Sequence, residues 1–337
     1  MIFNRKILHS RHQLSHQQID RLLNENSGSR YLAEKMRQLE RVKYFISLAD
    51  LLISNEVFFV CYKGAMLSYR IYGDASIRKS VDADIYVDSK IIGRAVEVLL
   101  GSGYTFSEEF CWPEKKIQQE LIIESSNHIA FDSQGKKLHV ELHWALNQCI
   151  PVSEKRFKEL LNENLTEINY AGRKLLVLNK EFELVNLLIH GSKHAWSNFK
   201  WLLDIRDYPV SDIDKEKFSG LVREFKAERI VRQTNILLEK YFNYTLPFNY
   251  KCRVPSSFIS IPIKTIENEN REIGKTSNII ENYIYQWLMF PGLISVKKKF
   301  ITSIFHAGDL NNIDSKYKIV YYLYRPYSFF RRRVVGS

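Results

Sequence analysis

The spacing of apolar positions changes once along the chain, near residue 180. Before that point, short apolar runs of strand length alternate with helical segments, whereas after it the apolar spacing is helical. The beginning of the chain is helical as well, with a capping-box pattern at Ser15 and Gln18 and helical spacing from Tyr31 to Leu52. The sequence therefore predicts a helical arm over residues 1–54, an α/β domain over 55–175 and a helical domain over 176–337.

The same spacing predicts the individual elements. Strands are expected over 57–62, 82–87, 127–131, 138–144, 165–168 and 174–178. The helices expected beside them are 15–23, 31–52, 65–72, 89–100, 153–161 and a further piece opened by Pro113. In the C-terminal part, helices are expected over 181–195, 198–206, 215–225, 230–242, 279–290 and 316–324.

Two of the predicted strands carry acidic residues on one face. Side chains two apart on a strand share a face, so Asp82 and Asp84 lie side by side while the apolar residues after them pack on the other face. Adjacent carboxylates repel each other, and a bound Mg²⁺, which prefers oxygen ligands, is the usual reason to keep such a pair. The strand at 138–144 repeats the pattern with His139, Glu141 and His143. If the two strands are neighbours, Glu141 is a third carboxylate at the same site.

The composition limits the class of protein and its partners. The chain of 337 residues is 45% hydrophobic and 26% charged, as in soluble globular proteins, and its net charge is +11. Such a surface attracts phosphates on nucleotides, RNA or acidic lipids, although a merely basic soluble protein has the same composition. The four cysteines show no metal-binding or disulfide spacing, and neither a signal peptide nor a membrane-spanning run is recognisable, so a cytoplasmic protein is expected.

An ordered series of motifs along the chain resembles a known superfamily. The motifs are Lys63-Gly64-Ala65, Arg78, Asp82-Ala83-Asp84, Glu141-Leu142-His143-Trp144, His190-x-x-Lys193-His194-x-Trp196 and Trp201-Leu202-Leu203-Asp204. Their order resembles the active-site pattern of the DNA polymerase β-like nucleotidyltransferases and, within them, the bacterial family of uncharacterised nucleotidyltransferases, over roughly residues 45 to 210. The resemblance implies an α+β fold with a small mixed β-sheet flanked by helices and an all-helical C-terminal domain.

The resemblance also implies a reaction and its site. The reaction is Mg²⁺-dependent transfer of a nucleoside monophosphate from an NTP to an acceptor, with release of pyrophosphate. Two Mg²⁺ or Mn²⁺ ions would be held by Asp82 and Asp84, and Glu141 would bind the ion that activates the nucleophile. Members of the superfamily modify RNA such as tRNA, proteins or small molecules, and some act as toxins, so the acceptor stays open. The residues expected at the nucleotide are Lys63, Gly64, Ala65, Arg78, Ser80, His143, Lys193 and His194.

Two departures from the superfamily pattern keep other functions open. Ala65 stands where Ser or Gly is usual, and the third acid is Glu141 where Asp is more common. A catalytically degenerate protein that only binds nucleotide or RNA would tolerate both changes. A further alternative is a zinc-dependent hydrolase built on His139, Glu141 and His143.

Two aromatic-rich segments in the C-terminal part have both a structural and a functional interpretation. Trp196, Phe199 and Trp201 are expected in a helical core, although one of them would also suit stacking on a base. Near residue 320, basic and aromatic residues are interleaved, which suits single-stranded RNA or peripheral contact with a membrane surface. The alternative is an amphipathic last helix with a solvated basic tail. The basic residues of this segment are Lys316, Lys318, Arg325, Arg331, Arg332 and Arg333.

Overall fold

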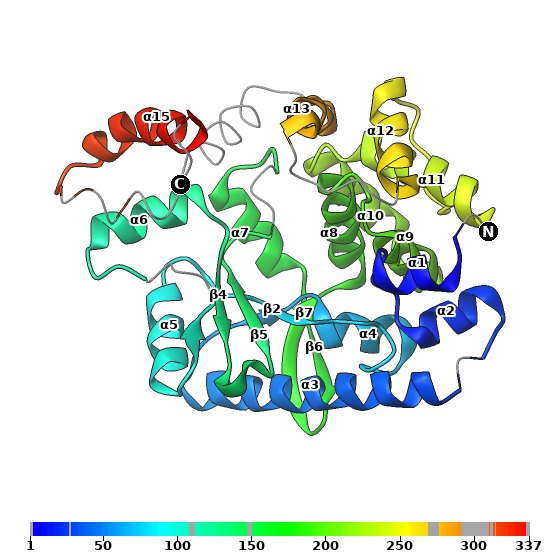
Figure 1. The fold of residues 1–337 in the computed structure, drawn as a ribbon, viewed down its shortest axis with the longest axis horizontal. Helices are drawn as coiled ribbons and strands as arrows, with labels where there is room; N and C mark the ends of the chain where they lie inside the picture. Colours follow the sequence, from blue (N-terminus) through cyan, green and yellow to red (C-terminus); the bar gives the residue numbers. More distant parts are fainter. Residues whose placement is uncertain are drawn as a thin grey trace.

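The structure is a computed structural model, which describes residues 3–26, 28–107, 112–146, 150–268, 276–290, 310, 313 and 315–334. In these residues the fold is of the mixed α+β class and is built around a seven-stranded sheet in the order β3-β4-β5-β2-β1-β7-β6 (Figure 1). The α+β fold class predicted from the sequence is confirmed. The strands are β1 (Val60–Cys61), β2 (Asp82–Tyr86), β3 (Thr105–Phe106), β4 (His128–Asp132), β5 (His139–His143), β6 (Leu165–Tyr170) and β7 (Arg173–Leu178).

Two parallel pairings organise the centre of the sheet. β2 lies parallel to β5, with Asp82 opposite His139 and Asp84 opposite Glu141, and antiparallel to β1. β1 lies parallel to β7, so the hairpin of β6 and β7 belongs to the same sheet. β4 and β5 form the hairpin expected from the sequence, and it delivers the second acidic strand to the edge of β2. The neighbouring strands that a third carboxylate requires are therefore present.

Helices cover both faces of the sheet, because successive residues of each strand point to opposite sides. Along β1, Val60 packs in the core shared with the C-terminal helices, and Cys61 packs in the core beneath α3 (Ser29–Ser54). Figure 1 shows α3 along one side of the sheet, with α8 to α11 gathered on the other. The α3 side is completed by α5 (Ile92–Gly101) and α6 (Lys116–Ser125), and the opposite side by α7 (Glu154–Glu163).

The chain becomes helical directly after β7, at the point near residue 180 where the spacing of apolar residues changes. The prediction missed α1, α12 and β3. The helix α12 contains Pro262, which argues against a helix in any local pattern, and β3 has only two residues. The last helix continues past its predicted end, through Pro326. The remaining helices are α1 (Arg5–Ser10), α2 (His16–Leu23), α4 (Gly64–Tyr72), α8 (Lys180–Lys193), α9 (Phe199–Asp207), α10 (Lys215–Glu224), α11 (Glu228–Phe242), α12 (Ser256–Glu267), α13 (Thr276–Met289) and α15 (Lys318–Val334).

The N-terminal helices divide between the two sides of the sheet. α2 begins with the predicted capping box, in which Ser15 and Gln18 each accept a backbone hydrogen bond from the other residue. Leu8 and Ile19 bury α1 and α2 among the C-terminal helices, whereas α3 packs against the opposite face through residues such as Leu48. The first helices therefore hold the sheet from both sides.

Among the described residues, no helix combines the length and the apolar character needed to cross a bilayer. Cys61 and Cys252 are free thiols, and burial raises the pKa of Cys61 to about 12. Cys111 and Cys149 lie outside the described residues. Cys61 is therefore a protonated core residue and not a reactive thiolate.

Candidate functional site

The turn from β1 into α4 lies directly against the start of β2. Lys63 is the N-cap of α4, and Gly64 follows it with a φ of +61°, a conformation that glycine adopts without strain. A Cβ atom on Gly64 would lie 3.0 Å from the carbonyl oxygen of Asp82. Glycine is therefore required for this close approach, which brings the N-terminal end of α4 beside the acidic strand.

Asp82, Asp84 and Glu141 are brought together by the pairing of β2 with β5. Asp84 lies opposite Glu141, and the ammonium group of Lys63 lies 3.3 Å from Asp84 Oδ1. Burial raises the pKa of Asp82, and the negative charges of Asp84 and Glu141 raise it further. The three predicted acids thus repel one another, and a bound cation would relieve this repulsion.

His143 joins two of the three carboxylates. Its Nε2 atom lies 3.2 Å from Asp84 Oδ1 and 2.9 Å from Glu141 Oε2. Burial by itself would raise the pKa of Asp84, but Lys63 and the hydrogen bond from His143 outweigh it and hold this pKa well below its usual range. The His143 ring is fixed by an edge contact with Tyr62 and by stacking on His128. One imidazole therefore orients both acids.

A histidine that the sequence analysis did not identify, His128, completes a group of potential metal ligands. His128, Glu141 and His143 each offer a ligand atom, and these atoms lie within 4.8 Å of one another. Burial lowers the pKa of His128, which keeps its ring neutral. His139, which the zinc alternative used, is hydrogen-bonded through Nδ1 to Asp132 Oδ1 at 2.9 Å, and its Nε2 atom lies 4.0 Å from Glu141. The structure thus groups His128, rather than His139, with Glu141 and His143 as potential ligands of one ion.

A tight turn ends α8 near these strands. The indole of Trp196 lies against Gly191, where a Cβ atom would overlap the ring, and the Trp196 backbone N–H donates to the Gly191 carbonyl oxygen at 2.9 Å. Trp196 is buried and its ring N–H donates to Gln233. The predicted core positions of Trp196 and Phe199 are confirmed. This packing fixes the turn that follows Lys193, the last residue of α8.

Lys193 and His194, at the end of α8, lie within electrostatic reach of the site. The positive charge of Lys193 is among the causes that lower the pKa of His128, after burial. Burial lowers the pKa of His194 to about 3, and the charges of Lys193 and Lys63 act in the same direction. The His194 ring packs against Trp201. His194 is therefore neutral at pH 7 and offers hydrogen bonds rather than charge.

Arg78 lies on the loop before β2 and is buried. Its Nε atom donates to both carboxylate oxygens of Asp204, on α9, at 2.9 Å. Its backbone N–H donates to Ser68 Oγ at 3.0 Å. Burial would lower the pKa of Arg78, but the Asp204 carboxylate outweighs it and raises this pKa. The ion pair ties the loop that leads to Asp82 to the C-terminal helices, and the phosphate contact predicted for Arg78 stays a prediction.

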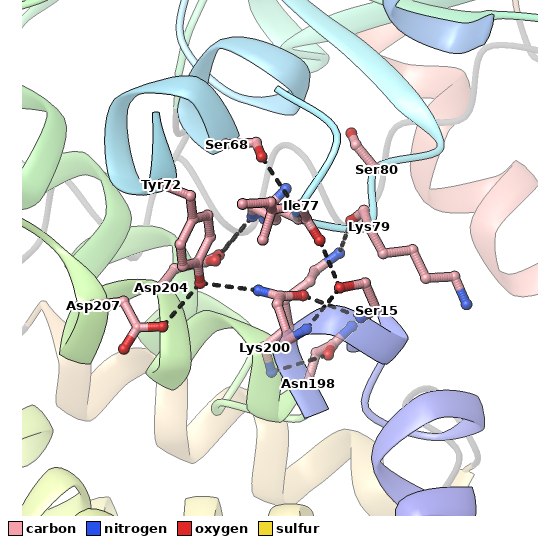
Figure 2. Close-up of polar contacts among 12 residues, drawn as sticks. Ser15, Ser68, Tyr72, Ile77, Lys79, Ser80, Asn198, Lys200, Asp204 and Asp207 are labelled. Atoms are coloured by element: carbon pink, nitrogen blue, oxygen red, sulfur yellow. Dashed lines mark hydrogen bonds and ion pairs between the residues drawn. The ribbon is translucent and has the colours of Figure 1, made fainter. Parts of the chain in front are cut away.

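A basic residue of α9, Lys200, lies beside the same loop. Figure 2 shows Lys200 next to Lys79, to whose carbonyl oxygen its Nζ atom donates at 3.1 Å. Burial lowers the pKa of Lys200 to about 7, and the charge of Arg78 acts in the same direction. The charge of Lys200 is in turn among the causes that hold down the pKa of Asp82. The Lys200 amine therefore lies within electrostatic reach of the acidic site.

A pocket lies between α3, the β1–α4 turn and the beginning of β2. Arg41 of α3 donates to the Ser80 carbonyl oxygen at 2.9 Å. The Ser80 hydroxyl donates to the Asp82 carbonyl oxygen at 3.0 Å. The lining of the pocket includes Lys63, Gly64, Ala65, Ser80, Asp82 and Asp84. The first four of these are residues predicted to bind the nucleotide, and they share the pocket with the Asp pair.

The sequence analysis did not identify three residues of this region, His128, Arg41 and Lys200. His128 lies opposite His143 in the β4–β5 hairpin, so applying an antiparallel register to the predicted hairpin would have found it. Lys200 directly precedes the Trp201 motif. Arg41 carries no local signal, because it is one of many basic residues along α3 and only the packing of α3 brings it to Ser80.

The basic and aromatic residues near residue 320 form α15, which lies beside α6 (Figure 1). Lys318 pairs with Glu120 and Glu124, and Arg325 donates to Ser125. The side chains of Arg332 and Arg333 lie outside the described residues. The exposed surface of α15 carries Ile319, Leu323, Tyr327, Phe330 and Arg331.

A protein-family model described as "Uncharacterised nucleotidyltransferase" matches residues 8–243 of the chain. The match extends from α1 to the end of α11 and contains every residue that lines the acidic site. No curated protein matches the chain. The family resemblance inferred from the sequence motifs is confirmed.

Proposed function

The chain belongs to the family of uncharacterised nucleotidyltransferases, and on this premise we propose that it transfers a nucleoside monophosphate from an NTP to an acceptor, with release of pyrophosphate. The observation that carries the proposal is the pairing of β2 with β5, which sets Asp82 and Asp84 beside Glu141. The proposed fold is polymerase β-like, with the helices after residue 175 as the second wall of the nucleotide cleft.

The triphosphate is proposed to lie at the N-terminal end of α4. The free backbone N–H groups and the positive end of a helix favour phosphate, and Gly64 lets the backbone approach closely. Because Ala65 offers no hydroxyl, the backbone and the nearby Ser80 hydroxyl would make these contacts. Lys63 and Lys200, whose positive charges both lower the pKa of Asp82, would bind the phosphate oxygens.

The three carboxylates fit Mg²⁺ or Mn²⁺, because both ions prefer oxygen ligands. A bound ion would also neutralise the repulsion that Asp84 and Glu141 exert on the buried Asp82. Asp82 and Asp84 would hold two ions, and Glu141 would hold one of them. When bound, the ions would activate the acceptor hydroxyl and stabilise the leaving pyrophosphate. The same donor set would bind neither ion well if His143 were not there to orient Asp84 and Glu141.

The side chains of the site would align the reaction. A new bond forms between the acceptor oxygen and the α-phosphorus, and the bond from that phosphorus to the bridging oxygen of the β-phosphate breaks. Lys63 and Lys200 would balance the charge of the pyrophosphate as it leaves. Lys193 and the neutral His194, at the end of α8, would contact the nucleotide from the opposite wall.

The proposal is tested by incubating the protein with each α-³²P-labelled NTP, Mg²⁺ or Mn²⁺, and three acceptor pools: total RNA, lysate protein and small-molecule extract. The wild type is compared with Asp82→Asn/Asp84→Asn, and with the control Asp88→Asn, whose carboxylate pairs with Lys158 outside the site. Label is expected in one pool with the wild type and the control, and is expected to be absent with the double variant. Equal labelling by the double variant would refute the mechanism.

Binding of nucleotide without any transfer would instead favour the catalytically degenerate alternative, a nucleotide- or RNA-binding protein. Among acceptors, RNA such as tRNA is supported by the net charge of +11. The exposed apolar and basic surface of α15 would suit either single-stranded RNA or a peripheral membrane contact. A protein or small-molecule acceptor, a toxin-like role and a cytoplasmic location stay predictions.

A zinc-dependent hydrolase is the second candidate, and one observation favours it. His128, Glu141 and His143 form a set of two imidazoles and one carboxylate, which is typical of catalytic zinc sites. Metal analysis of the purified protein separates the two candidates. Stoichiometric zinc that is lost in His128→Asn, with no nucleotidyl transfer by the wild type, would favour the hydrolase.

A further inference from the structure

A second group of potential metal ligands lies on the N-terminal helices, away from the three carboxylates of the acidic strands. His9 lies in the last turn of α1, His16 begins α2, and Glu34 lies on α3. Each offers one ligand atom, and the three atoms lie within 4.8 Å of one another. Three separate helices therefore converge on one point.

Glu34 is the buried member of the group, with 5% of its surface exposed. Its Oε1 atom lies 3.2 Å from His9 Nε2, and its Oε2 atom accepts the backbone N–H of His16 at 2.6 Å. Its charge also acts on Lys79 and Arg41. A carboxylate is costly to bury unless a positive charge balances it, and a cation held by the Glu34 oxygens would add to the balance that Lys79 and Arg41 give.

The two imidazoles lie against each other, and one of them has a ring nitrogen without a partner among the described residues. Their rings lie parallel, with centroids 4.2 Å apart. The Nδ1 atom of His16 is buried and has no hydrogen-bond partner in the part of the chain that the structure describes. A buried polar atom normally finds a partner, because its desolvation is otherwise uncompensated.

We propose that His9, His16 and Glu34 form a second metal site, which takes a divalent transition metal of the Zn²⁺ class. Two imidazoles and one carboxylate suit zinc, with a water molecule in the fourth position, and they discriminate against Mg²⁺, which prefers oxygen ligands. The site is independent of the proposed nucleotidyl transfer, because none of its ligands belongs to the acidic strands.

The proposed ion has a structural role, because it would join helices that pack on opposite faces of the sheet. α2 also holds the loop that leads to Asp82. Figure 2 shows Ser15 beside Ile77, to whose carbonyl oxygen its hydroxyl donates at 2.5 Å, and Gln18 donates to the Tyr72 hydroxyl at 3.1 Å. A metal at His16 would therefore brace this loop from the N-terminal side.

The test uses Co²⁺ as a spectroscopic probe in a full-length background that carries His128→Asn and His143→Asn, which removes the histidines of the other ligand group. Stoichiometric Co²⁺ binding is expected, with the intense visible absorption of a four-coordinate ion, and Zn²⁺ is expected to displace it. Adding His16→Asn or Glu34→Gln should abolish the absorption, while His139→Asn, which belongs to neither group, should leave it unchanged.

Thermal unfolding gives a readout that does not depend on the spectrum. Zn²⁺ should raise the Tm of the background protein but not of the background with His16→Asn, because a ligand stabilises only the state that binds it. Far-UV circular dichroism checks that each variant is folded. If His16→Asn does not fold, His9→Asn, at the half-exposed end of α1, replaces it. Absence of saturable Co²⁺ binding by the folded background, or unchanged binding in the ligand variants, would overturn the proposal.

Discussion

Arg78 and Asp204 form a buried ion pair between the loop before β2 and helix α9. The Nε atom of Arg78 donates to both carboxylate oxygens at 2.9 Å, and the two residues are 5% and 1% exposed. The pair connects segments that are far apart in the sequence, and Arg78 lies four residues before Asp82, the first residue of the acidic strand. The position of Asp82 therefore depends on a contact with the C-terminal helices.

Replacing Asp204 by Ala should destabilise the protein by about 3–5 kcal/mol, because Arg78 would be left buried without its partner. The free energy of unfolding, from denaturant titration of both proteins, is the measurement. The matched control is Asp212→Ala, which removes a carboxylate paired with Lys180 at the surface. The control should change stability little, because solvent screens exposed pairs. A similar loss in both variants would contradict the structural role of the Arg78 pair.

Replacing Gly64 by Ala should reduce both stability and nucleotide binding. The new Cβ atom would meet the Asp82 carbonyl oxygen at 3.0 Å, and the φ of +61° costs a non-glycine residue about 1–2 kcal/mol. Gly220→Ala is the opposite case, because Gly220 lies inside α10 with open space around it. That control should gain roughly 0.5–1 kcal/mol from helix propensity. Unfolding free energies and the Kd of a non-hydrolysable NTP measure both effects, and a neutral Gly64→Ala would show that the turn is free to move.

Replacing His143 by Gln should weaken the binding of Mn²⁺ together with a non-hydrolysable NTP. His143 orients Asp84 and Glu141, and the loss of such a positioning residue typically weakens metal affinity by roughly 10- to 100-fold. Electron paramagnetic resonance of free Mn²⁺ during titration gives the affinity. His139→Gln serves as the comparison, because His139 bonds Asp132. Equal affinities in wild type and His143→Gln would mean that the acids are held in place without the imidazole.

The affinity for an NTP should fall as the pH rises through about 7, which is the pKa to which burial lowers Lys200. Below this pH the amine is charged and attracts phosphate, whereas above it the amine is neutral. Loss of one charged contact corresponds to roughly a tenfold weaker Kd. Isothermal titration between pH 6 and 9 measures the change. Lys200→Met should bind weakly at every pH and remove this dependence, and a wild-type profile that matches the variant would exclude the contact.

The sequence alone was sufficient to predict most elements and the acidic strands, because both depend on local rules. The alternation of side chains along a strand places Asp82 and Asp84 on one face before any tertiary contact is known. The capping box at Ser15 and the β4–β5 hairpin are equally local, and each is present in the structure. The motif series, which is also read along the chain, was sufficient to predict the family.

The tertiary structure decided which of these local features meet. The pairing of β2 with β5 makes Glu141 a neighbour of Asp84, and the position of α9 pairs Arg78 with Asp204. Neither the group of His9, His16 and Glu34 nor the approach of Arg41 to Ser80 has a local signal. Each of these contacts joins residues on different elements, and packing of the helices on the two faces of the sheet brings those elements together.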